Sequence, residues 1–313
     1  MQQFGGRSET KRTAAAIGSA LRSRQIVDRD LETLAKFLGR GLGYPSQYFS
    51  QVLNRLAEHP TPTGFPRYGY VLEAGEKIVG AILLIFSTIW SDAAPAVRCH
   101  VTSWFVEPEF RPYAALFFSK ALRCPGVTYI NTSARPATRP IIKAQGFLPY
   151  SNGKFIAFPA LNFWSRPKGD RVKVIAGDKD PNARFEPHEL DLLKAHSGYG
   201  CICLWCETSE RAYPFVFHQR VLKGFLPSVQ LVFCRGIQSF VRFASPLGLY
   251  LAAHGKLPVL IDSNGPIHGL VGKYIEGITP RYYKGPRPPR LGDLSYTQAV
   301  MCSDIRRDSP YAH

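Results

Sequence analysis

The chain has 313 residues, of which 45% are hydrophobic and 20% are charged. This composition is ordinary for a soluble globular protein, and the length allows two domains or one large one with a substantial core. The formal net charge of +16 is not ordinary. It indicates anionic partners, such as phosphate-bearing ligands, an acidic carrier protein, nucleic acid or an anionic membrane surface, without choosing among them.

The cysteines and the apolar segments predict a cytoplasmic setting. Seven cysteines in a chain of this length do not resemble a disulfide framework. The longest apolar run, residues 78–86, is far shorter than the roughly 20 residues of a membrane span. The residues before Gln25 include five basic residues and one acidic residue. Residues 1–25 are therefore predicted to be a disordered basic leader, with an organellar presequence as the alternative.

Two helices and a hairpin are predicted next. Residues 26–40 and 46–59 carry apolar side chains at helical spacing. Residues 68–74 and 77–89 flank a tight Glu-Ala-Gly-Glu connection and are typical of two antiparallel strands. The run at 78–86 is too apolar for a half-exposed strand, so we expect it in the middle of the sheet.

The stretch from Trp104 to Phe118 is predicted to be a strand, a short turn and a helix. Residues 97–106 read as a strand that Pro108 ends. A helix follows from Arg111, with Pro112 in its first turn. Its predicted apolar face consists of Leu116, Phe117, Ala121 and Leu122. Such a corner presents free N–H groups and the positive end of a helix dipole, which suits phosphate.

This order of residues resembles the acyl-CoA-binding segment of the GNAT superfamily of N-acyltransferases. Residues 106–111, Val-Glu-Pro-Glu-Phe-Arg, match the family's Val-x-Pro-Glu-Tyr-Arg. In the loop that follows, Ala114 stands where the family has its first Gly, and Leu116 stands at the second Gly/Ala position. The alternative is a helix that merely packs on a sheet after a proline turn.

The following elements extend the resemblance over residues 26–160. Residues 127–131 predict a short strand, 138–145 a short helix closed by Gly146, and 147–158 a returning strand. Gln145-Gly146-Phe147 matches the family's closing Leu-Gly-Phe. The implied fold is a mixed α/β (α+β) one, with a mostly antiparallel sheet flanked by helices.

After a linker at residues 161–185, the second half repeats this plan faintly. The predicted elements are a helix at 186–196, strands at 201–207, 213–220 and 229–235, a helical stretch at 236–254 interrupted by Pro246, and a strand at 257–262. We interpret residues 186–285 as a degenerate GNAT-like half, so that two halves stand in tandem. An unrelated α/β partner domain is the alternative. Residues 286–313 are predicted to be an extended basic tail, continuing a basic, proline-rich run from Arg281.

The resemblance implies a set of cofactor-binding residues. They are Trp104, Phe105, Val106, Arg111, Pro112, Tyr113, Ala114, Ala115, Leu116 and Arg135. Arg111 is the best candidate for a phosphate contact. The family often has a Tyr four residues before the Gly of Leu-Gly-Phe, as the acid toward the departing thiolate, and here that residue is Ile142. The usual thiolate acid is therefore missing.

Three residues are candidates for the remaining chemistry. Glu107 lies at the strand end, where a carboxylate can act as a base through water; a solvated surface position is the alternative. His100 is predicted to share a face with Trp104, which also suits a core histidine. Asn131 ends the strand at 127–131, where it can touch a ligand or cap the next turn.

No metal site is predicted. Cys201-x-Cys203-x-x-Cys206 invites a zinc interpretation, but Cys206 faces the other side of a strand from the first two. No Gly-x-Ser-x-Gly elbow accompanies Asp262 and Ser263, so a hydrolytic set is not supported.

The predicted function is transfer of an acyl group from acyl-CoA, or from an acyl carrier protein, to a small-molecule or peptide amine by direct attack. Trp104, Phe105, Phe117 and Phe118 could line a site for acetyl-CoA or a longer acyl-CoA. One alternative is a decayed GNAT-like module that binds a ligand or protein for regulation. Another is a tandem transferase resembling the Fem-type aminoacyl-tRNA-dependent ligases. Nucleic acid is otherwise not an expected partner.

Overall fold

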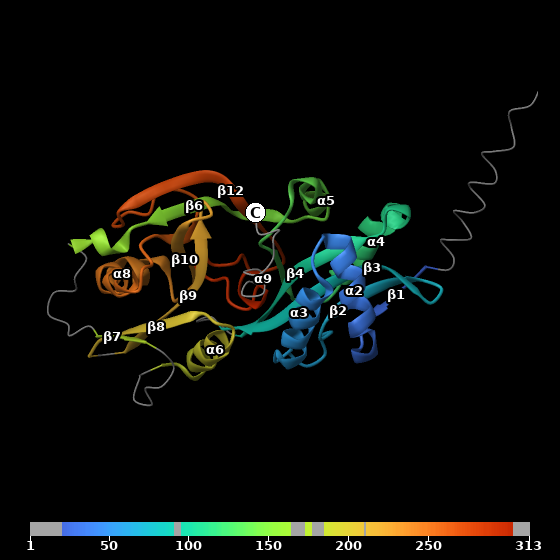
Figure 1. The fold of residues 1–313 in the computed structure, drawn as a ribbon, viewed down its shortest axis with the longest axis horizontal. Helices are drawn as coiled ribbons and strands as arrows, with labels where there is room; N and C mark the ends of the chain where they lie inside the picture. The colour runs from blue at the N-terminus through green and yellow to red at the C-terminus, as the bar shows by residue number, and fades with distance from the viewer. Residues whose placement is uncertain (1–20, 91–94, 164–172, 177–184, 210, 303–313) are drawn as a thin grey trace, which may run out of the picture. The chain divides into compact units, whose positions relative to one another are not determined.

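The structure is a computed structural model that describes residues 21–90, 95–163, 173–176, 185–209 and 211–302 (Figure 1). It divides into two compact units. Within the described residues, unit 1 comprises residues 21–89 and 96–127, and unit 2 comprises Trp90, Pro95 and residues from Thr128 onward. Of the helices in these ranges, none has the length and apolar character needed to cross a membrane.

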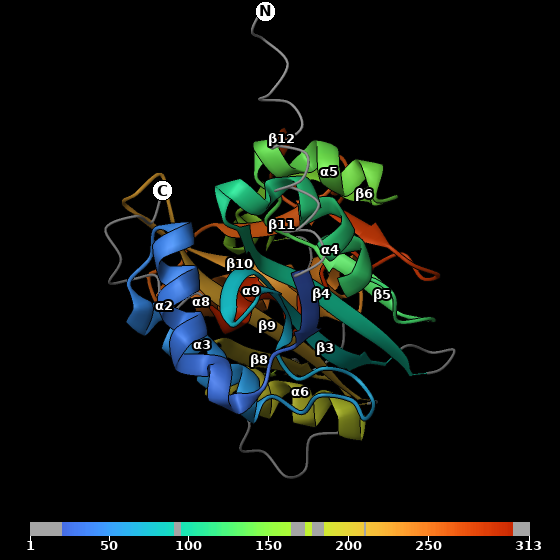
Figure 2. The ribbon, with the colours of Figure 1, turned by 90° about the vertical axis from the view of Figure 1, so that its right-hand side faces the viewer.

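Unit 1 combines an antiparallel sheet with helices on both faces (Figure 2). Its elements are β1 (Leu21–Gln25), η1 (Asp28–Asp30), α2 (Leu31–Leu42), α3 (Ser46–Glu58), β2 (Gly69–Ala74), β3 (Lys77–Ile89), β4 (Ala96–Val106), η2 (Pro108–Tyr113) and α4 (Ala114–Ala121). The strands lie in the order β1-β2-β3-β4. β3 is buried along most of its length between β2 and β4, as its apolar run predicts.

Apolar spacing explains the two helices of unit 1 that cover one face. α2 buries Leu34 and Leu38 one turn apart and ends at Gly43, whose φ of +76° is left-handed. α3 buries Phe49, Val52 and Leu56 on one stripe. The sequence places all these residues correctly. It is wrong about residues 21–25, which form β1 on the edge of β2 instead of belonging to a leader; residues 1–20 lie outside the described residues.

Unit 2 contains the rest of the regular structure. Its elements are β5 (Thr128–Asn131), η3 (Pro136–Thr138), α5 (Arg139–Ala144), β6 (Leu148–Ala157), η4 (Pro159–Leu161), β7 (Lys173–Ala176), α6 (Pro187–Gly198), β8 (Ile202–Glu207), β9 (Ala212–Leu222), β10 (Leu226–Cys234), α7 (Ile237–Arg242), α8 (Ala244–Ala253), β11 (Val259–Ser263), β12 (Gly272–Lys284) and α9 (Gln298–Met301). The strands lie in the order β5-β12-β6-β11-β10-β9-β8-β7.

In the middle of unit 2, strands that are far apart in the sequence lie next to each other in the sheet. β12, near the end of the chain, lies between β5 and β6, and β6 in turn lies between β12 and β11. The observed units therefore divide the chain differently from the predicted domains, because β6 pairs with strands that come more than 100 residues later. β10 and β11 form a parallel pair, but only at two positions, Val229 with Val259 and Gln230 with Leu260.

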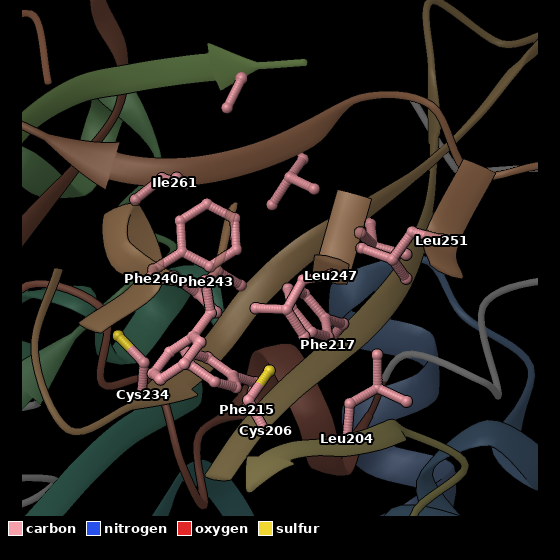
Figure 3. Close-up of a cluster of buried hydrophobic side chains, with 14 of the residues drawn as sticks. Leu204, Cys206, Phe215, Phe217, Cys234, Phe240, Phe243, Leu247, Leu251 and Ile261 are labelled. Atoms are coloured by element: carbon pink, nitrogen blue, oxygen red, sulfur yellow. The ribbon is translucent and has the colours of Figure 1, made fainter. Parts of the chain in front are cut away.

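Each face of the unit 2 sheet has its own core. On one face, Phe240 of α7, Leu247 of α8 and Phe243 between these helices pack against strand residues such as Phe215 and Ile261 (Figure 3). On the other face, the core is formed by residues of α6, the strands and the segment near the C-terminus, namely Leu192, Leu193, Cys201, Cys203, Trp205, Ala212, Val216, Val232, Phe233, Leu294 and Val300. The break in the predicted 236–254 helix falls at Phe243, whereas Pro246 lies in the first turn of α8.

Two predictions about the end of the chain are wrong. Arg281, predicted to begin a basic arm, is 7% exposed and belongs to β12. Residues 292–302 are not an extended tail, because Leu294, Val300 and Met301 are buried and α9 forms there. Within the predicted linker, residues 173–176 form β7 at the sheet edge, pairing with β8; residues 164–172, 177–184 and 303–313 lie outside the described residues.

The predicted fold class is confirmed. The sheets are mostly antiparallel, with helices on their faces. The order of elements from β1 to β6 is strand, helices, three strands, helix, strand, helix, strand. The order from β7 to β12 is similar, but the number of helices differs and no helix separates β11 from β12. The arrangement in two tandem halves stays a prediction.

Candidate functional site

β4 contains a bulge. Beyond it, the alternation of side chains between the two faces of the sheet is reversed. Thr102 pairs with Leu83 and Phe105 pairs with Ala81, so that Ser103 and Trp104 together oppose one residue of β3. Ser103 has a φ of +47°, a left-handed conformation. A bulge of this kind leaves one residue out of the hydrogen-bonded ladder. The backbone at Ser103 and Trp104 therefore has a polar group that β3 does not use.

The bulge corrects the prediction that His100 and Trp104 share a face. Paired residues of antiparallel strands lie on the same face, so that His100 and Phe105, opposite Ile85 and Ala81, lie together. Phe105 contacts Phe37 of α2, with ring centroids 5.4 Å apart. Trp104 points the other way. His100 is 1% exposed and is a residue of the core.

Trp104 packs on the helix that follows the strand. Its ring centroid lies 4.6 Å from that of Phe118 in α4. Its Nε1 is buried and has no hydrogen-bond partner in the described chain. The side chain is half-buried, so Trp104 stands at the margin of the core under α4. Val106, the last residue of β4, is buried.

The turn after β4 is longer than predicted. A 3₁₀ turn, η2, occupies residues 108–113, so that Pro112 lies inside this turn and α4 begins only at Ala114. The N–H of Phe110 donates to the carbonyl of Glu107, and the N–H of Ala114 donates to the carbonyl of Arg111. The N–H group of Ala114 is therefore already used inside the corner and is not one of the free N–H groups expected there.

Leu116 does not belong to the buried face of α4. Its side chain is 55% exposed, whereas Ala114, Phe117 and Ala121 are buried. The buried residues of α4, Ala114, Phe117, Phe118 and Ala121, recur at helical spacing, and Leu116 lies outside this stripe. Ala115 beside it is exposed, as is Arg111 in the preceding turn, and Tyr113 is half-buried. At this corner, the guanidinium of Arg111 and the large apolar side chain of Leu116 are exposed to solvent.

Glu107 is held by two cations. Its Oε1 accepts a hydrogen bond from Arg40 at 3.1 Å, and its Oε2 accepts one from Lys77 at 2.8 Å. Arg40 and Lys77 are 71% and 65% exposed, whereas Glu107 is 12% exposed. Both carboxylate oxygens are occupied, which favours an anchoring role for Glu107 over that of a base.

The other predicted site residues lie in unit 2. Asn131 ends β5, and its Oδ1 accepts a hydrogen bond from the N–H of Ser133 at 3.1 Å, so that it caps the turn. Arg135 is exposed immediately before η3. Ile142, at the position of the missing thiolate acid, is 1% exposed in α5.

A buried ionic cluster in unit 2 escaped the sequence analysis. Lys154 Nζ on β6 lies 2.7 Å from Oδ1 of Asp262 on β11 and 2.8 Å from Oε1 of Gln230 on β10. Arg281 Nε on β12 donates to Oδ2 of Asp262 at 3.0 Å. The side chains of Lys154, Arg281 and Asp262 are 12%, 8% and 3% exposed. The one local signal was a lysine inside an apolar alternating strand.

Burial and charge shift the titration of this cluster. Burial lowers the pKa of Lys154 from 10.5 to about 8, although the charge of Asp262 opposes this change. Burial alone would raise the pKa of Asp262, but Arg281 and Lys154 together hold that pKa below its ordinary value. Asp262 is therefore ionised at neutral pH, and one carboxylate serves two buried cations.

The end of β10 is occupied by the chain itself. Beyond the two positions paired with β11, the carbonyl of Val232 accepts a hydrogen bond from the N–H of Leu294 at 2.7 Å. The N–H of Cys234 donates to the carbonyl of Gly292 at 3.1 Å. The guanidinium of Arg290 lies over the ring of Phe233, 5.4 Å from its centroid. The edge of β10 is thus filled by residues 290–294.

The cysteines do not form a ligand set. Cys203 and Cys206 lie on opposite faces of β8, in different cores. In the part of the chain that the structure describes, no group of three or more His, Cys, Asp or Glu side chains is placed to hold a metal ion.

Comparison with known proteins reveals the fold. No protein-family model and no curated protein matches the sequence. A GCN5-related N-acetyltransferase from Anabaena variabilis ATCC 29413 is similar in structure, with a TM-score of 0.56, 8% identity, and coverage of 84% of this chain and 72% of that chain. One from Kribbella flavida has a TM-score of 0.53, 14% identity, and coverage of 84% and 70%.

A third similar structure is a conserved protein of Enterococcus faecalis V583 described as a probable N-acyltransferase, with a TM-score of 0.52, 10% identity, and coverage of 88% of this chain and 74% of that chain. Each match covers more of the chain than either unit contains. The resemblance to the GNAT superfamily is therefore confirmed as a resemblance of fold.

Proposed function

We propose that the protein is an N-acyltransferase that takes its acyl group from acyl-CoA, with unit 1 holding the CoA portion. The observation that carries the proposal is the corner after β4, where a matching Val-Glu-Pro-Glu-Phe-Arg segment ends with Arg111 exposed. The similarity of fold to a GCN5-related N-acetyltransferase supports this proposal. Arg111 would bind a phosphate by charge-assisted hydrogen bonds.

The bulge in β4 supports a second part of the site. Acyl transfer needs a donor that stabilises the oxygen of the thioester carbonyl as it becomes negative. An N–H group at Ser103 or Trp104 that β3 does not bind can serve this purpose without any particular side chain. The amine forms the new C–N bond, the C–S bond breaks, CoA leaves as the thiolate, and the proton of the amine passes to water or a base.

The structure of the corner indicates which groups would bind a phosphate. The N–H group of Ala114 is already bonded within the turn, so affinity would depend on Arg111 more than on bare amides. Leu116 is turned outward, with 55% of its surface exposed. The acyl acceptor proposed is an amine of a small molecule or peptide.

A second candidate, a regulatory module that binds CoA esters without turning them over, has specific support. Both oxygens of Glu107 are ion-paired, and Ile142 supplies no proton to a thiolate. Binding without release of free thiol in the presence of a panel of amines would favour this module over the enzyme.

Thermal shift with CoA, acetyl-CoA and a long-chain acyl-CoA tests the proposal. A ligand far above its Kd raises the stability of the folded chain and its Tm. Arg111→Ala should weaken CoA binding roughly 10- to 100-fold, the value of a charged hydrogen bond of about 1.5–3 kcal/mol. Arg123→Ala is the matched control, because Arg123 is exposed in unit 1 just beyond α4.

Two results would remove the proposal. One is the absence of any Tm change with all three ligands. The other is an equal response of the Arg111 and Arg123 variants, because the corner would then have no special part in binding.

A further inference from the structure

The cluster around Asp262 carries more positive than negative charge. Lys154 and Arg281 are both hydrogen-bonded to the one carboxylate of Asp262. The third partner of the cluster, Gln230, is neutral. Among the largely buried groups of the described chain, these three ionised side chains leave one positive charge in excess, and they are at most 12% exposed. Arg220 of β9, opposite Ser228, is a further cation near Lys154, but it is only half-buried, so that water screens its charge. A buried charge without a counter-charge is costly.

The cluster also has an unused polar neighbour. Ser228 is completely buried, and its Oγ has no hydrogen-bond partner among the described residues. It lies two residues before Gln230 on β10, hence on the same face and about 7 Å away along the strand. A buried polar atom without a partner is unusual in a folded protein. An additional ligand group beside Gln230 would satisfy both the charge and the hydroxyl.

We infer that the Lys154–Arg281–Ser228 side of this cluster is a binding site for the carboxylate group of a small molecule. The groups that remain there are hydrogen-bond donors, which match an acceptor-only oxyanion. A single negative charge balances the excess, whereas a phosphate dianion would exceed it. Lys154 and Arg281 retain 12% and 8% exposure, so an anion of a few atoms can reach them.

All of these residues belong to unit 2, whereas the corner proposed to bind acyl-CoA belongs to unit 1. The charged and titratable groups that face Lys154 come from three neighbouring strands. They are Asp262 of β11, Arg281 of β12, and Arg220 of β9. His218 of β9 pairs with Gln230 and lies on the same face. Between pH 7 and pH 9.5, Lys154 is the member of this set whose charge we expect to change.

Acetate is the probe. At a fixed ionic strength, replacing sodium chloride with sodium acetate should raise the Tm of the intact chain by about 2–4 °C near saturation at pH 7. The gain should disappear at pH 9.5, where Lys154 is neutral. Acetate also stabilises proteins in general, and Lys273→Met measures this background, because Lys273 is exposed on β12.

Two variants of the cluster sharpen the test. Lys154→Met removes the excess charge and should abolish the acetate-specific gain while leaving Asp262 paired with Arg281. Asp262→Asn increases the excess positive charge and should enlarge the rise in Tm caused by acetate, because acetate then replaces the lost carboxylate. An acetate effect that is equal in wild type, Lys154→Met and Lys273→Met would overturn the proposal, as would an effect in wild type that is unchanged at pH 9.5. Phosphate in place of acetate should give the smaller response; a larger one contradicts the choice of a monoanion.

Discussion

Glu107 in unit 1 and Asp262 in unit 2 are each held by two cations, yet their surroundings are opposite. Around Glu107, the partners Arg40 and Lys77 are 71% and 65% exposed. Around Asp262, the partners Lys154 and Arg281 are 12% and 8% exposed. The two arrangements have the same charges, one negative and two positive, at similar distances.

The difference shows that burial determines how much an ion pair contributes to stability. Exposed pairs contribute up to about 1 kcal/mol, because water and salt screen them. In a buried pair, removing one partner leaves a charge that neither water nor protein compensates, at a cost of about 3–5 kcal/mol. The cations around Glu107 can leave it with little effect on the fold. Those around Asp262 are part of the fold.

Removal of the buried carboxylate should have the largest effect. Asp262→Asn leaves Lys154 and Arg281 without a counter-charge and should lower the free energy of unfolding by about 3 kcal/mol or more. Urea denaturation in chloride buffer at pH 7 measures this loss. A loss below 1 kcal/mol would contradict the comparison, since the cluster would then behave like an exposed one.

The second-largest expected effect is a pH dependence of stability that is caused by Lys154. The pKa of Lys154 in the folded chain is about 8, below the 10.5 of an unfolded chain. Between these values, the unfolded chain holds a proton that the folded chain has released, so stability should rise with pH through this window. The shift corresponds to about 3 kcal/mol. Below pH 8, this contribution is absent.

The wild type must be compared with Lys154→Met, because other groups titrate in the same range. Burial raises the pKa of Cys234 to about 12 and also raises that of Cys206, so these thiols make stability fall above pH 9. They are common to both proteins. The difference between the two unfolding free energies from pH 7.5 to pH 10.5 therefore reports Lys154, and a flat difference would mean that Lys154 is not desolvated.

Glu107, whose partners are exposed, should give a smaller effect. Glu107→Gln should lower the free energy of unfolding by no more than about 1 kcal/mol, because both of its partners are largely exposed. The loss should shrink further in 1 M salt. If Glu107→Gln costs as much as Asp262→Asn in the same urea experiment, exposure does not explain the contrast.

The fold was predictable where apolar spacing is regular. α2, α3 and the β2–β3 hairpin follow directly from their patterns. β12 was missed, because its pairing with β6 jumps from Glu276 to Arg281. The residues between them, 277–280, include Gly, Thr and Pro and look like a turn. β1 and β7 are short edge strands, which leave little periodicity in a sequence.

The candidate site was predictable only as far as it is local. The corner after β4 is one continuous segment, and its Arg111 can be found from neighbouring residues. The cluster around Asp262 draws on residues 154, 262 and 281 of three strands, and no spacing in the sequence relates them. The face of His100 was predicted wrongly, because one extra residue in a strand reverses all the alternation beyond it.

Replacement of Ser103 by glycine at the bulge should have the smallest effect, and this bulge can be compared with its counterpart in unit 2. β10 also has a bulge, between Leu231 and Phe233, but Ser103 in β4 is the one held at a positive φ, +47°. Glycine adopts this conformation without strain, while it also increases the entropy of the unfolded chain. Ser103→Gly should therefore change the free energy of unfolding by about 0.5 kcal/mol or less, whereas Ser103→Val should lower it by about 1–3 kcal/mol. Urea denaturation of the pair measures both. Equal stability of the Gly and Val variants would mean that β4 runs straight past Ser103, and His100 and Trp104 would then share a face after all.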